Sequence, residues 1–261
     1  MSWPRYAFAG DREIAVKILK FLLGDVPPKA LMISHPNHAS HSKELRELCS
    51  FLPPEYVFVG SEFRSRMAID RLKELDLDLI ISIHFPYLFT KPILEIPKIG
   101  ILNLHPAYLP FNRGWHTVTW AILENTPIGA TLHFVDEGID SGDIVHQRAL
   151  EIQPDDTAHK LYQRLLELEY QVFKEAWEQI KAGNIRRIRQ DPSKGTFHLK
   201  KDLFDSKIQK LDLNSYEKVG DLLRKLRALT TNRLEEAAYF EVDGRRYYVQ
   251  ITITPEASAS K

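Results

Sequence analysis

The stretch that decides the fold is residues 99–116, IGILNLHPAYLPFNRGWH, in which an apolar run ends on polar side chains. Residues 99–104 read as a buried strand. Residues two apart on a strand point to the same side, so Asn103 and His105 present their polar groups together. Pro106 lacks a backbone N–H and helps to end the strand. We therefore predict an amide and an imidazole at a sheet edge, where a ligand can reach them.

Short apolar runs alternate with amphipathic ones before this stretch. The runs expected as strands are residues 6–9, 30–33, 56–60, 79–83 and 99–104, and the expected helices are 12–23, 43–51, 65–75 and 91–95. Several strands are apolar at every position, as strands covered on both faces must be. The alternation predicts an α/β fold with a Rossmann-like, open, mostly parallel sheet. Such sheets bind ligands at the carboxyl ends of their strands.

The chain after residue 130 divides into two parts of different character. Residues 131–136 and 144–152 are expected strands, followed by a long helix that Asp155 or Asp156 caps and that ends before Gly183. Further on, the pattern predicts a helix over 216–229 and a hairpin of 237–241 and 247–254 around Asp243 and Gly244. We predict a catalytic domain over residues 1–190 and a small C-terminal α+β subdomain over 191–261.

Composition excludes several classes of partner. Thirty-five basic and thirty-five acidic side chains give a formal net charge of zero, which favours neither a nucleic acid nor a membrane surface. We find no apolar window of membrane-spanning length and no signal-peptide pattern at the start. Cys49 is the single cysteine, so no intrachain disulfide is expected, which fits a reducing cytoplasm. We expect a cytoplasmic protein.

The residues at the predicted strand end suit acyl transfer. An amide that donates a hydrogen bond can stabilise an oxyanion while a neighbouring imidazole moves a proton. The glycine-broken acidic segment VDEGIDSGD, residues 135–143, supplies a candidate partner in Asp140. Asp140 returns to His105 if the sixth strand lies beside the fifth. A carboxylate there would orient the imidazole and balance its charge.

Two segments invite a metal interpretation. Asp136, Glu137, Asp140 and Asp143 resemble calcium ligands, but the glycine spacing is wrong and Gln147 stands where an EF-hand needs Glu. The second segment holds three histidines spaced three apart, which suits zinc or a polar loop that leads into a helix: His35, His38 and His41. We favour the polar loop and predict no metal.

Two further signals are weaker. Arg64 and Arg66 suit solvated charges at a helix start, with a phosphate contact as the alternative. Gly10 stands without the other glycines of a dinucleotide fingerprint, so NAD binding is not expected.

The motif residues carry a resemblance to a known family. Asn103, His105, Pro106, Leu109, Pro110, Arg113, Gly114, Gly129, Thr131 and the loop from Asp140 to Gly142 resemble the signature of the folate-dependent formyltransferases, over most of residues 5–185. The longer string HPAYLPFNRGWHTVTWAI is most similar to the nucleotide-sugar N-formyltransferases. Residues 190–261 hold thirteen Lys and Arg against eleven Asp and Glu, too small an excess for a strong tRNA footprint.

The resemblance implies a reaction and its residues. A formyl group would pass from N10-formyltetrahydrofolate to the amine of a nucleotide-linked sugar, dTDP-4-amino-4,6-dideoxyglucose, for a surface glycan such as O-antigen. Asn103, His105 and Asp140 would be catalytic. The implied pterin contacts are Phe85, Tyr87, Leu88, Asp136, Gly138 and Ile139, and the implied sugar-nucleotide contacts are Tyr108, Asn112, Arg113 and Trp115. Related sugar enzymes are commonly dimers, so we expect a homodimer.

Alternatives stay open at this stage. Another acceptor, such as a ribonucleotide amine, methionyl-tRNA or water, would make the chain a different formyltransferase or a hydrolase. An inactive folate-binding module would keep the scaffold without turnover. The sugar itself is also open, because a 3-amino isomer or a GDP-linked perosamine differs only by contacts that the sequence does not place. The C-terminal hairpin, with Tyr239, Tyr247, Tyr248 and Val249, would supply a dimer interface or pack on the first domain.

Overall fold

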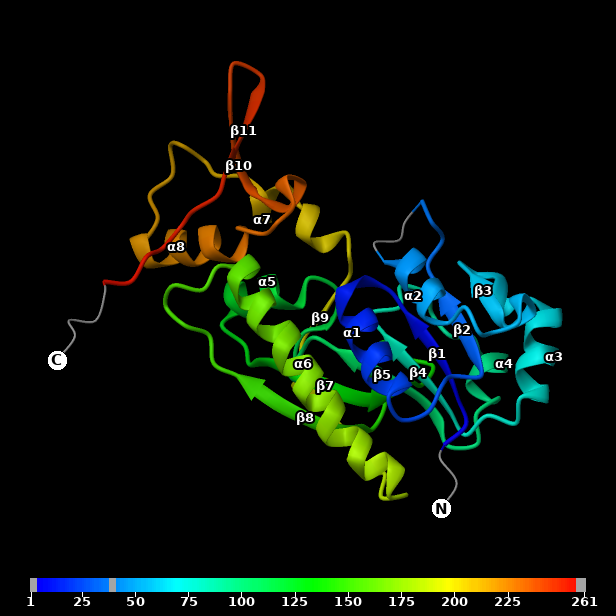
Figure 1. The fold of residues 1–261 in the computed structure, drawn as a ribbon. Helices are drawn as coiled ribbons and strands as arrows, with labels where there is room; N and C mark the ends of the chain where they lie inside the picture. The colour runs from blue at the N-terminus through cyan, green and yellow to red at the C-terminus, as the bar shows by residue number, and fades with distance from the viewer. Residues whose placement is uncertain (1–3, 38–40, 257–261) are drawn as a thin grey trace. The chain divides into compact units, whose positions relative to one another are not determined.

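The computed structural model describes residues 4–37 and 41–256, which include a seven-stranded sheet (Figure 1). Its strands are β1 (Tyr6–Gly10), β2 (Ala30–Ile33), β3 (Val57–Val59), β4 (Leu79–Ile83), β5 (Gly100–His105), β7 (Ile128–Phe134) and β8 (Ile144–Leu150). Their order across the sheet is β3-β2-β1-β4-β5-β7-β8. The first five strands in this order run parallel to one another. The next strand, β7, runs antiparallel to β5. The predicted α/β fold with a mostly parallel sheet is confirmed.

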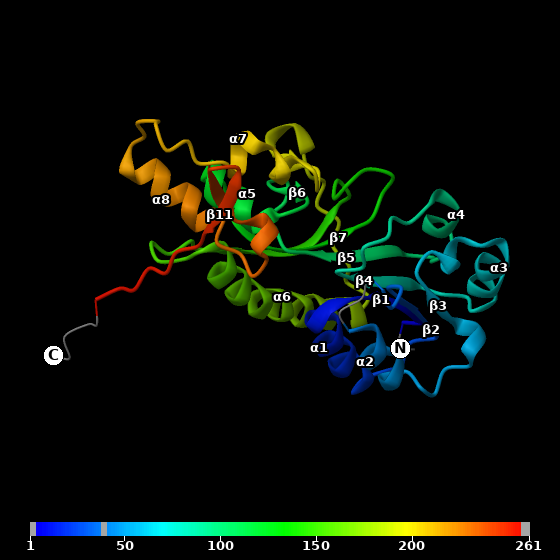
Figure 2. The ribbon, with the colours of Figure 1, turned by 90° about the horizontal axis from the view of Figure 1, so that it is seen from above.

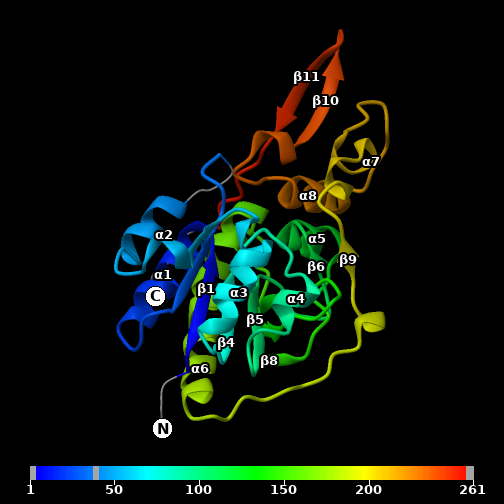
Figure 3. The ribbon, with the colours of Figure 1, turned by 90° about the vertical axis from the view of Figure 1, so that its right-hand side faces the viewer.

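The described part of the chain also contains α-helices. They are α1 (Arg12–Leu23), α2 (Ser42–Leu48), α3 (Arg66–Glu74), α4 (Lys91–Leu94), α5 (Thr117–Glu124), α6 (Ala158–Lys181), α7 (Ser206–Gln209) and α8 (Val219–Ala228). Figure 3 shows α1 and α2 on one side of β1, and α3 and α4 on the other. Figure 2 shows α6 on the side of α1, where Phe21 meets Tyr170 and Phe173 edge to face.

Apolar patterning explains why these segments fold as they do. Asp11 caps α1 by accepting the backbone N–H of Arg12, and the helix buries Ile14, Ile18 and Leu22. On the other face, one buried cluster joins helix residues Phe63, Ala68, Leu72 and Ile93 to strand residues Ala7, Met32, Ile80 and Ile101. Because both faces of the central strands are covered, their ends are the natural place for polar groups.

The chain forms two compact units. The first contains residues 1–105, 130–148 and 168–191, and the second contains residues 106–129, 149–167 and 192–261. One division falls between Asp191 and Pro192, next to the predicted boundary after residue 190. The two-domain division at that boundary stays a prediction. The second unit holds two small sheets, β6 (Arg113–Gly114) with β9 (Phe197–His198) and β10 (Ala238–Val242) with β11 (Arg245–Val249).

Several local predictions were wrong. Helix α5 was not predicted, because it buries side chains all round and shows no amphipathic pattern. The cap of α6 is Thr157, whose hydroxyl accepts the N–H of Lys160, whereas the Asp156 carboxylate accepts the N–H of Gln153 and pairs with Arg164.

Some boundaries also differ from the sequence prediction. Helix α8 begins at Val219, three residues later than predicted. The hairpin turn is Asp243-Gly244, as predicted, with both residues at positive φ. Its second strand, however, is Arg245–Val249 rather than 247–254.

Candidate active site

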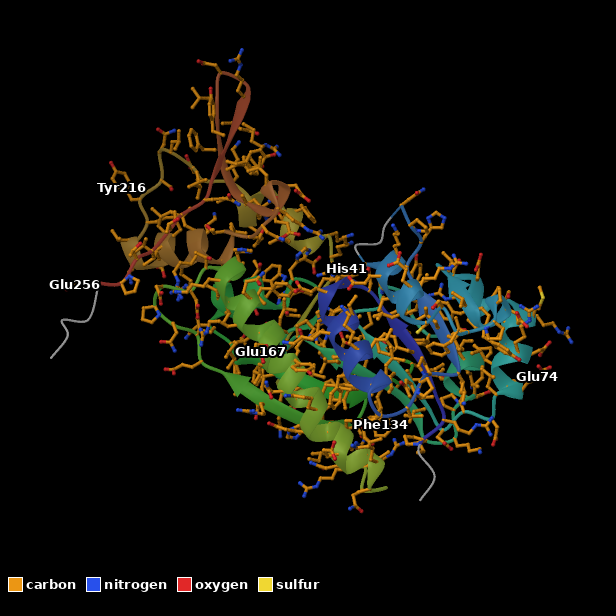
Figure 4. The ribbon with its side chains drawn as sticks, in the orientation of Figure 1. His41, Glu74, Phe134, Glu167, Tyr216 and Glu256 are labelled. Carbon is orange, nitrogen blue, oxygen red and sulfur yellow. The ribbon has the colours of Figure 1, made fainter. Side chains whose placement is uncertain are left out.

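The end of β5 places the two motif side chains in the first unit. Asn103 and His105 alternate with buried Leu104, and His105 is 6% exposed. The sixth predicted strand, β7, does lie beside the fifth, with Asn103 opposite His133 and His105 opposite Thr131. This pairing brings the following acidic loop back to the strand end. Figure 4 labels Phe134, the residue at which β7 ends and the loop begins.

The acidic loop places Asp140 next to His105. Oδ2 of Asp140 lies 3.7 Å from Nδ1 of His105, and both side chains are largely buried. This separation lies beyond the usual hydrogen-bond distance for the two atoms, yet it is close enough for strong charge coupling. Thus a carboxylate that is thirty-five positions away in the sequence lies within charge-coupling range of the imidazole.

A second histidine, His133, completes the cluster and was missed in the sequence. Its Nε2 lies 3.3 Å from Nδ2 of Asn103 and 3.5 Å from Oδ1 of Asp140, and its Nδ1 lies 2.8 Å from the carbonyl oxygen of Phe134. A carbonyl only accepts, so Nδ1 carries a proton, and Nε2 faces the Asn103 amide. The sequence does show polar residues alternating in β7, at Thr131 and His133. It does not show that His133 lies opposite Asn103, because this depends on the strand pairing.

Ser82 on β4 fixes the other side of the Asn103 amide. The Ser82 hydroxyl donates to Oδ1 of Asn103 at 2.9 Å, and Ser82 lies opposite Asn103 in the parallel register. With Oδ1 occupied and Nδ2 turned to His133, one amide N–H remains for another acceptor. The amide is thereby preorganised as a hydrogen-bond donor, which is the property that an oxyanion site requires.

The acidic loop is internally braced. Oδ1 of Asp136 accepts the N–H of Gly138 at 3.0 Å and the Ser141 hydroxyl at 2.8 Å. Gly142 packs so closely on β7 that a Cβ there would lie 2.0 Å from the carbonyl oxygen of Phe134. Asp140 itself has a φ of 50°, which is unusual for a residue with a side chain. The loop is therefore held in one conformation, and this conformation sets the position of the Asp140 carboxylate.

A further histidine, His84, follows the neighbouring strand β4. Its Nε2 lies 2.7 Å from Oε1 of Glu169 on α6, and the Glu169 side chain is fully buried. Within the part of the chain that the structure describes, Oε2 of Glu169 has no hydrogen-bond partner. Because the two side chains form a short hydrogen bond and are buried, we interpret the pair as a structural contact of the first unit.

The predicted pterin contacts divide into two groups. Phe85 and Tyr87 turn inward and pack on Phe63, with ring centroids 5.5 and 6.4 Å away. Leu88 points outward and is 68% exposed, and its carbonyl oxygen accepts from Arg64 Nη2 at 2.6 Å. Arg64 is therefore bound to the loop after β4 in this structure rather than simply solvated.

The rest of the predicted pterin site lies in the acidic loop. Asp136, Gly138 and Ile139 are all exposed there. Exposed backbone next to an apolar wall suits a flat heterocycle with polar edges. The pterin role of both segments stays a prediction.

The predicted sugar-nucleotide contacts lie in the second unit. Asn112 is 1% exposed and its amide donates to Thr126 and Pro127, each at 3.0 Å, so it braces its own loop. Nη2 of Arg113 donates to the carbonyl oxygen of Pro192 at 3.3 Å.

The other two residues of this set differ in their surroundings. Trp115 is exposed and carries the ammonium group of Lys200 over its ring at 5.0 Å. Tyr108 is half-buried. The substrate roles of all four residues stay predictions.

Other candidate chemistry gains no support from the structure. Burial raises the pKa of the Cys49 thiol to about 12, so this cysteine is not an activated nucleophile. Within residues 4–37 and 41–256, no group of three His, Cys, Asp or Glu side chains is placed to hold a metal. Of the three-histidine segment, His38 lies outside the described residues.

Outside the polar cluster, the first unit carries a surface hollow. A surface hollow of about 590 Å³ at the end of α6, lined by Gln179, Gly183, Asn184, Ile185 and Arg186, shares no residue with the polar cluster. None of the helices in the described part of the chain has the length and apolar character that crossing a membrane requires.

Comparisons with known proteins give the class to which this site belongs. The family model described as formyl transferase matches residues 28–177, more than half of the chain. A second model, described as the N-formyltransferase dimerization C-terminal domain, matches residues 204–255. The chain belongs to the formyltransferase family, as the motif resemblance predicted.

Two individual relatives show which formyltransferases this chain is similar to. The dTDP-4-amino-4,6-dideoxyglucose formyltransferase of Mycobacterium tuberculosis is 31% identical over 182 residues, covering 70% of this chain and 76% of the relative. The methionyl-tRNA formyltransferase of Geobacter sulfurreducens is 34% identical, covering 74% of this chain and 63% of the relative.

Solved structures extend the comparison. A sugar N-formyltransferase from a Shewanella species shares the fold, with a TM-score of 0.81, 21% identity and coverage of 97% of this chain and 99% of that one. A formyltransferase from Anoxybacillus kamchatkensis is 33% identical with a TM-score of 0.50, over 66% of this chain and 86% of that one. That protein was solved with tetrahydrofolate and UDP-4,6-dideoxy-4-formamido-L-AltNAc.

Proposed function

We propose that the protein transfers a formyl group from N10-formyltetrahydrofolate to the amino group of a nucleotide-linked deoxyamino sugar. The observation that carries the proposal is the cluster of Asn103, His105 and Asp140 at one strand end, in a chain of the formyltransferase family. Two findings support the sugar as acceptor. One is the C-terminal match to the N-formyltransferase domain, and the other is the relative solved with a folate and a formamido sugar nucleotide.

The residues divide the chemistry among them. N10-formyltetrahydrofolate supplies the formyl group, and its carbonyl oxygen becomes an oxyanion when the neutral amine attacks. The Asn103 N–H and protonated His105 stabilise that oxyanion, because preorganised donors are strongest where charge develops. Asp140 holds the imidazolium and helps to pass the amine proton toward the leaving nitrogen. Ser82 and His133 keep the Asn103 amide turned with its donor available.

The residues present fit a folate at the same edge. The segment with Phe85, Tyr87 and Leu88 would form the apolar wall, and Asp136, Gly138 and Ile139 would offer backbone groups to the polar edges of the pterin. The exposed Leu88 side chain and the open backbone of the loop support this placement. On the acceptor side, Tyr108, Asn112, Arg113 and Trp115 would contact the sugar nucleotide, with the Arg113 guanidinium suited to a diphosphate.

Among sugars, we favour dTDP-4-amino-4,6-dideoxyglucose as the acceptor. The support is the Mycobacterium tuberculosis relative, which carries this substrate in its name. The product would be a formamido sugar for a surface glycan such as O-antigen. A folate-dependent reaction in a reducing compartment also fits the single buried Cys49, and we place the enzyme in the cytoplasm.

An acceptor panel tests the proposed function. Tetrahydrofolate release is followed by absorbance with dTDP-linked 4-amino and 3-amino sugars, GDP-perosamine, glycinamide ribonucleotide, methionyl-tRNA and no acceptor. We expect turnover that depends on a dTDP-linked 4-amino sugar. Turnover without acceptor would indicate a hydrolase, preference for methionyl-tRNA or the ribonucleotide would indicate another transformylase, and silence with every acceptor would indicate an inactive folate-binding module.

We further propose a homodimer formed through the C-terminal region. The family model that matches residues 204–255 is named for dimerization. Apolar side chains are exposed in and beside this region, among them Tyr216 (labelled in Figure 4), Val219, Leu223, Tyr247 and Tyr248. Such exposure is typical of interfaces. Light scattering should give twice the chain mass, and the double variant Tyr247→Arg, Tyr248→Arg should give the chain mass; a monomeric natural protein would exclude the proposal.

A further inference from the structure

One side chain from outside the acidic loop, Gln190, holds the backbone around Asp140. Gln190 is 7% exposed and lies fifty positions beyond Asp140 in the sequence. Its Nε2 donates to the carbonyl oxygen of Asp140 at 3.0 Å and to that of Gly142 at 2.6 Å. Because both partners are carbonyl oxygens, the amide must present its NH₂ group to the loop. A single side chain therefore bridges the carbonyls on either side of Ser141.

Asp140 needs such support because its backbone is in an unfavourable region. Its φ of 50° lies in the left-handed region, which costs most residues with a Cβ about 1–2 kcal/mol and Asp somewhat less. Relaxing that dihedral would swing the carboxylate, which now lies between His105 and His133 at 3.7 and 3.5 Å. A small backbone change at Asp140 would alter both separations together. The Gln190 hydrogen bonds oppose this change.

The segment that carries Gln190 is itself firmly attached in the first unit. Ile188 exchanges two backbone hydrogen bonds with Ile144, at 2.8 and 2.9 Å. Arg187 donates to the carbonyl oxygen of Ile99 at 2.7 Å and lies 3.5 Å from the centre of the Phe134 ring. These contacts tie the segment to the strands before and after the acidic loop. Gln190 thus acts on the loop from a fixed base.

We infer that Gln190 is a positioning residue, which sets the Asp140 carboxylate relative to His105 and His133 through the loop backbone. The kinetic part of this inference rests on the proposed formyl transfer. Removing the two donors should leave the loop folded but let Asp140 move, and misplacing a reacting group by about 1 Å costs up to about 100-fold in rate. Neither the motif resemblance nor the strand pattern pointed to this residue.

A double-mutant cycle tests whether Gln190 affects turnover through the Asp140 carboxylate. Gln190→Met keeps the length of the side chain and removes both donors, and it should lower kcat by about 30-fold while KM values change less than about 2-fold. In an Asp140→Asn background the same substitution should have less than about a 2-fold effect, because its target is already gone. Equal losses in both backgrounds would show a purely structural role and overturn the inference.

Controls and a second readout keep the test independent of the substrate. Gln179→Glu, a half-buried glutamine on α6, should leave kcat unchanged, whereas Gln190→Glu turns a carboxylate toward two carbonyls and should match or exceed Gln190→Met. Ring ¹⁵N chemical shifts of His105 and His133 should move in Gln190→Met in the direction seen in Asp140→Asn. Unchanged shifts would refute the inference even if no acceptor supports turnover, and changed shifts without turnover would refute only the proposed reaction.

Discussion

Two histidines at the ends of adjacent parallel strands, His84 after β4 and His105 on β5, meet their carboxylates very differently. His84 Nε2 lies 2.7 Å from Glu169, whose side chain is fully buried. His105 Nδ1 lies 3.7 Å from Asp140, whose side chain is 15% exposed. The first distance is a short hydrogen bond, and the second lies beyond the usual hydrogen-bond range.

The difference teaches that a buried histidine–carboxylate pair is not by itself a catalytic sign. The Glu169 carboxylate is committed to one ring, whereas the Asp140 carboxylate faces two imidazoles and is carried by a braced loop. In the proposed mechanism the pair of His105 and Asp140 must also reach the reacting atoms. Substitutions in the two pairs and around them should separate an effect on turnover from an effect on stability.

The largest effect should follow from His105→Asn. In the proposed mechanism this substitution removes the proton carrier and one oxyanion donor, so turnover should fall by about 10³-fold. The buried volume changes little, and the melting temperature should stay within about 2 °C. Turnover is measured with the preferred acceptor, and melting by circular dichroism. An active variant would exclude the assignment of His105.

The opposite pattern should follow from His84→Ala. Removing the ring leaves the Glu169 carboxylate buried without its partner, which should lower the free energy of unfolding by about 3 kcal/mol. The kcat of the folded variant should stay within about 3-fold of the natural value, because no reacting group is touched. Urea unfolding and initial rates at low temperature separate the two quantities. A stable but inactive His84 variant would reverse the contrast.

A smaller effect should follow from Ser82→Ala, which acts on the amide beside His105. The Asn103 Oδ1 loses the 2.9 Å hydrogen bond that fixes its orientation. One neutral hydrogen bond is worth about 1 kcal/mol, so kcat should fall by about 5-fold to 10-fold with KM unchanged. Ser82→Thr, which keeps the hydroxyl, serves as the matched control. A rise in KM with kcat unchanged would place Ser82 in substrate binding instead.

The smallest effect concerns a half-exposed carboxylate of the same unit, Asp25. Burial opposes its ionisation, but hydrogen bonds from Trp177 Nε1 at 2.8 Å and Lys181 Nζ at 3.0 Å outweigh that, so the pKa of Asp25 lies below its ordinary value. The unfolded state then takes up the proton at a higher pH than the folded state does. The stabilisation is present at neutral pH and is lost as the pH falls through the folded pKa.

Asp25→Asn should therefore make the free energy of unfolding depend less on pH in the acidic range. At pH 7 the variant should be less stable by under about 1 kcal/mol, the range of a solvent-screened ion pair. The gap between variant and natural protein should close below pH 4. Thermal melts from pH 7 to pH 3 measure it, and a gap that widens in acid would contradict the sign.

Local patterns predicted much of the fold and part of the site. The β4 strand was expected over residues 79–83 and occupies Leu79–Ile83, because an unbroken apolar run needs no distant information. Asn103 and His105 were found from their two-residue spacing, which is also local. Helix α5 escaped prediction because its side chains are buried on all sides, and the cap of α6 went to Thr157 because the Asp156 carboxylate found Arg164.

The sequence alone determined most of the order of strands and helices, the family, and the two polar groups that leave β5, since these rest on local patterns and on motif residues. Only the tertiary structure decided that Asp140 and His133 meet at that strand end, that Gln190 holds the loop, and that His84 belongs to Glu169. Those partners lie between 30 and 85 positions apart. The physical reason is that hydrogen bonds and charge coupling act over a few ångströms, and only packing of the sheet brings such distant residues within that range.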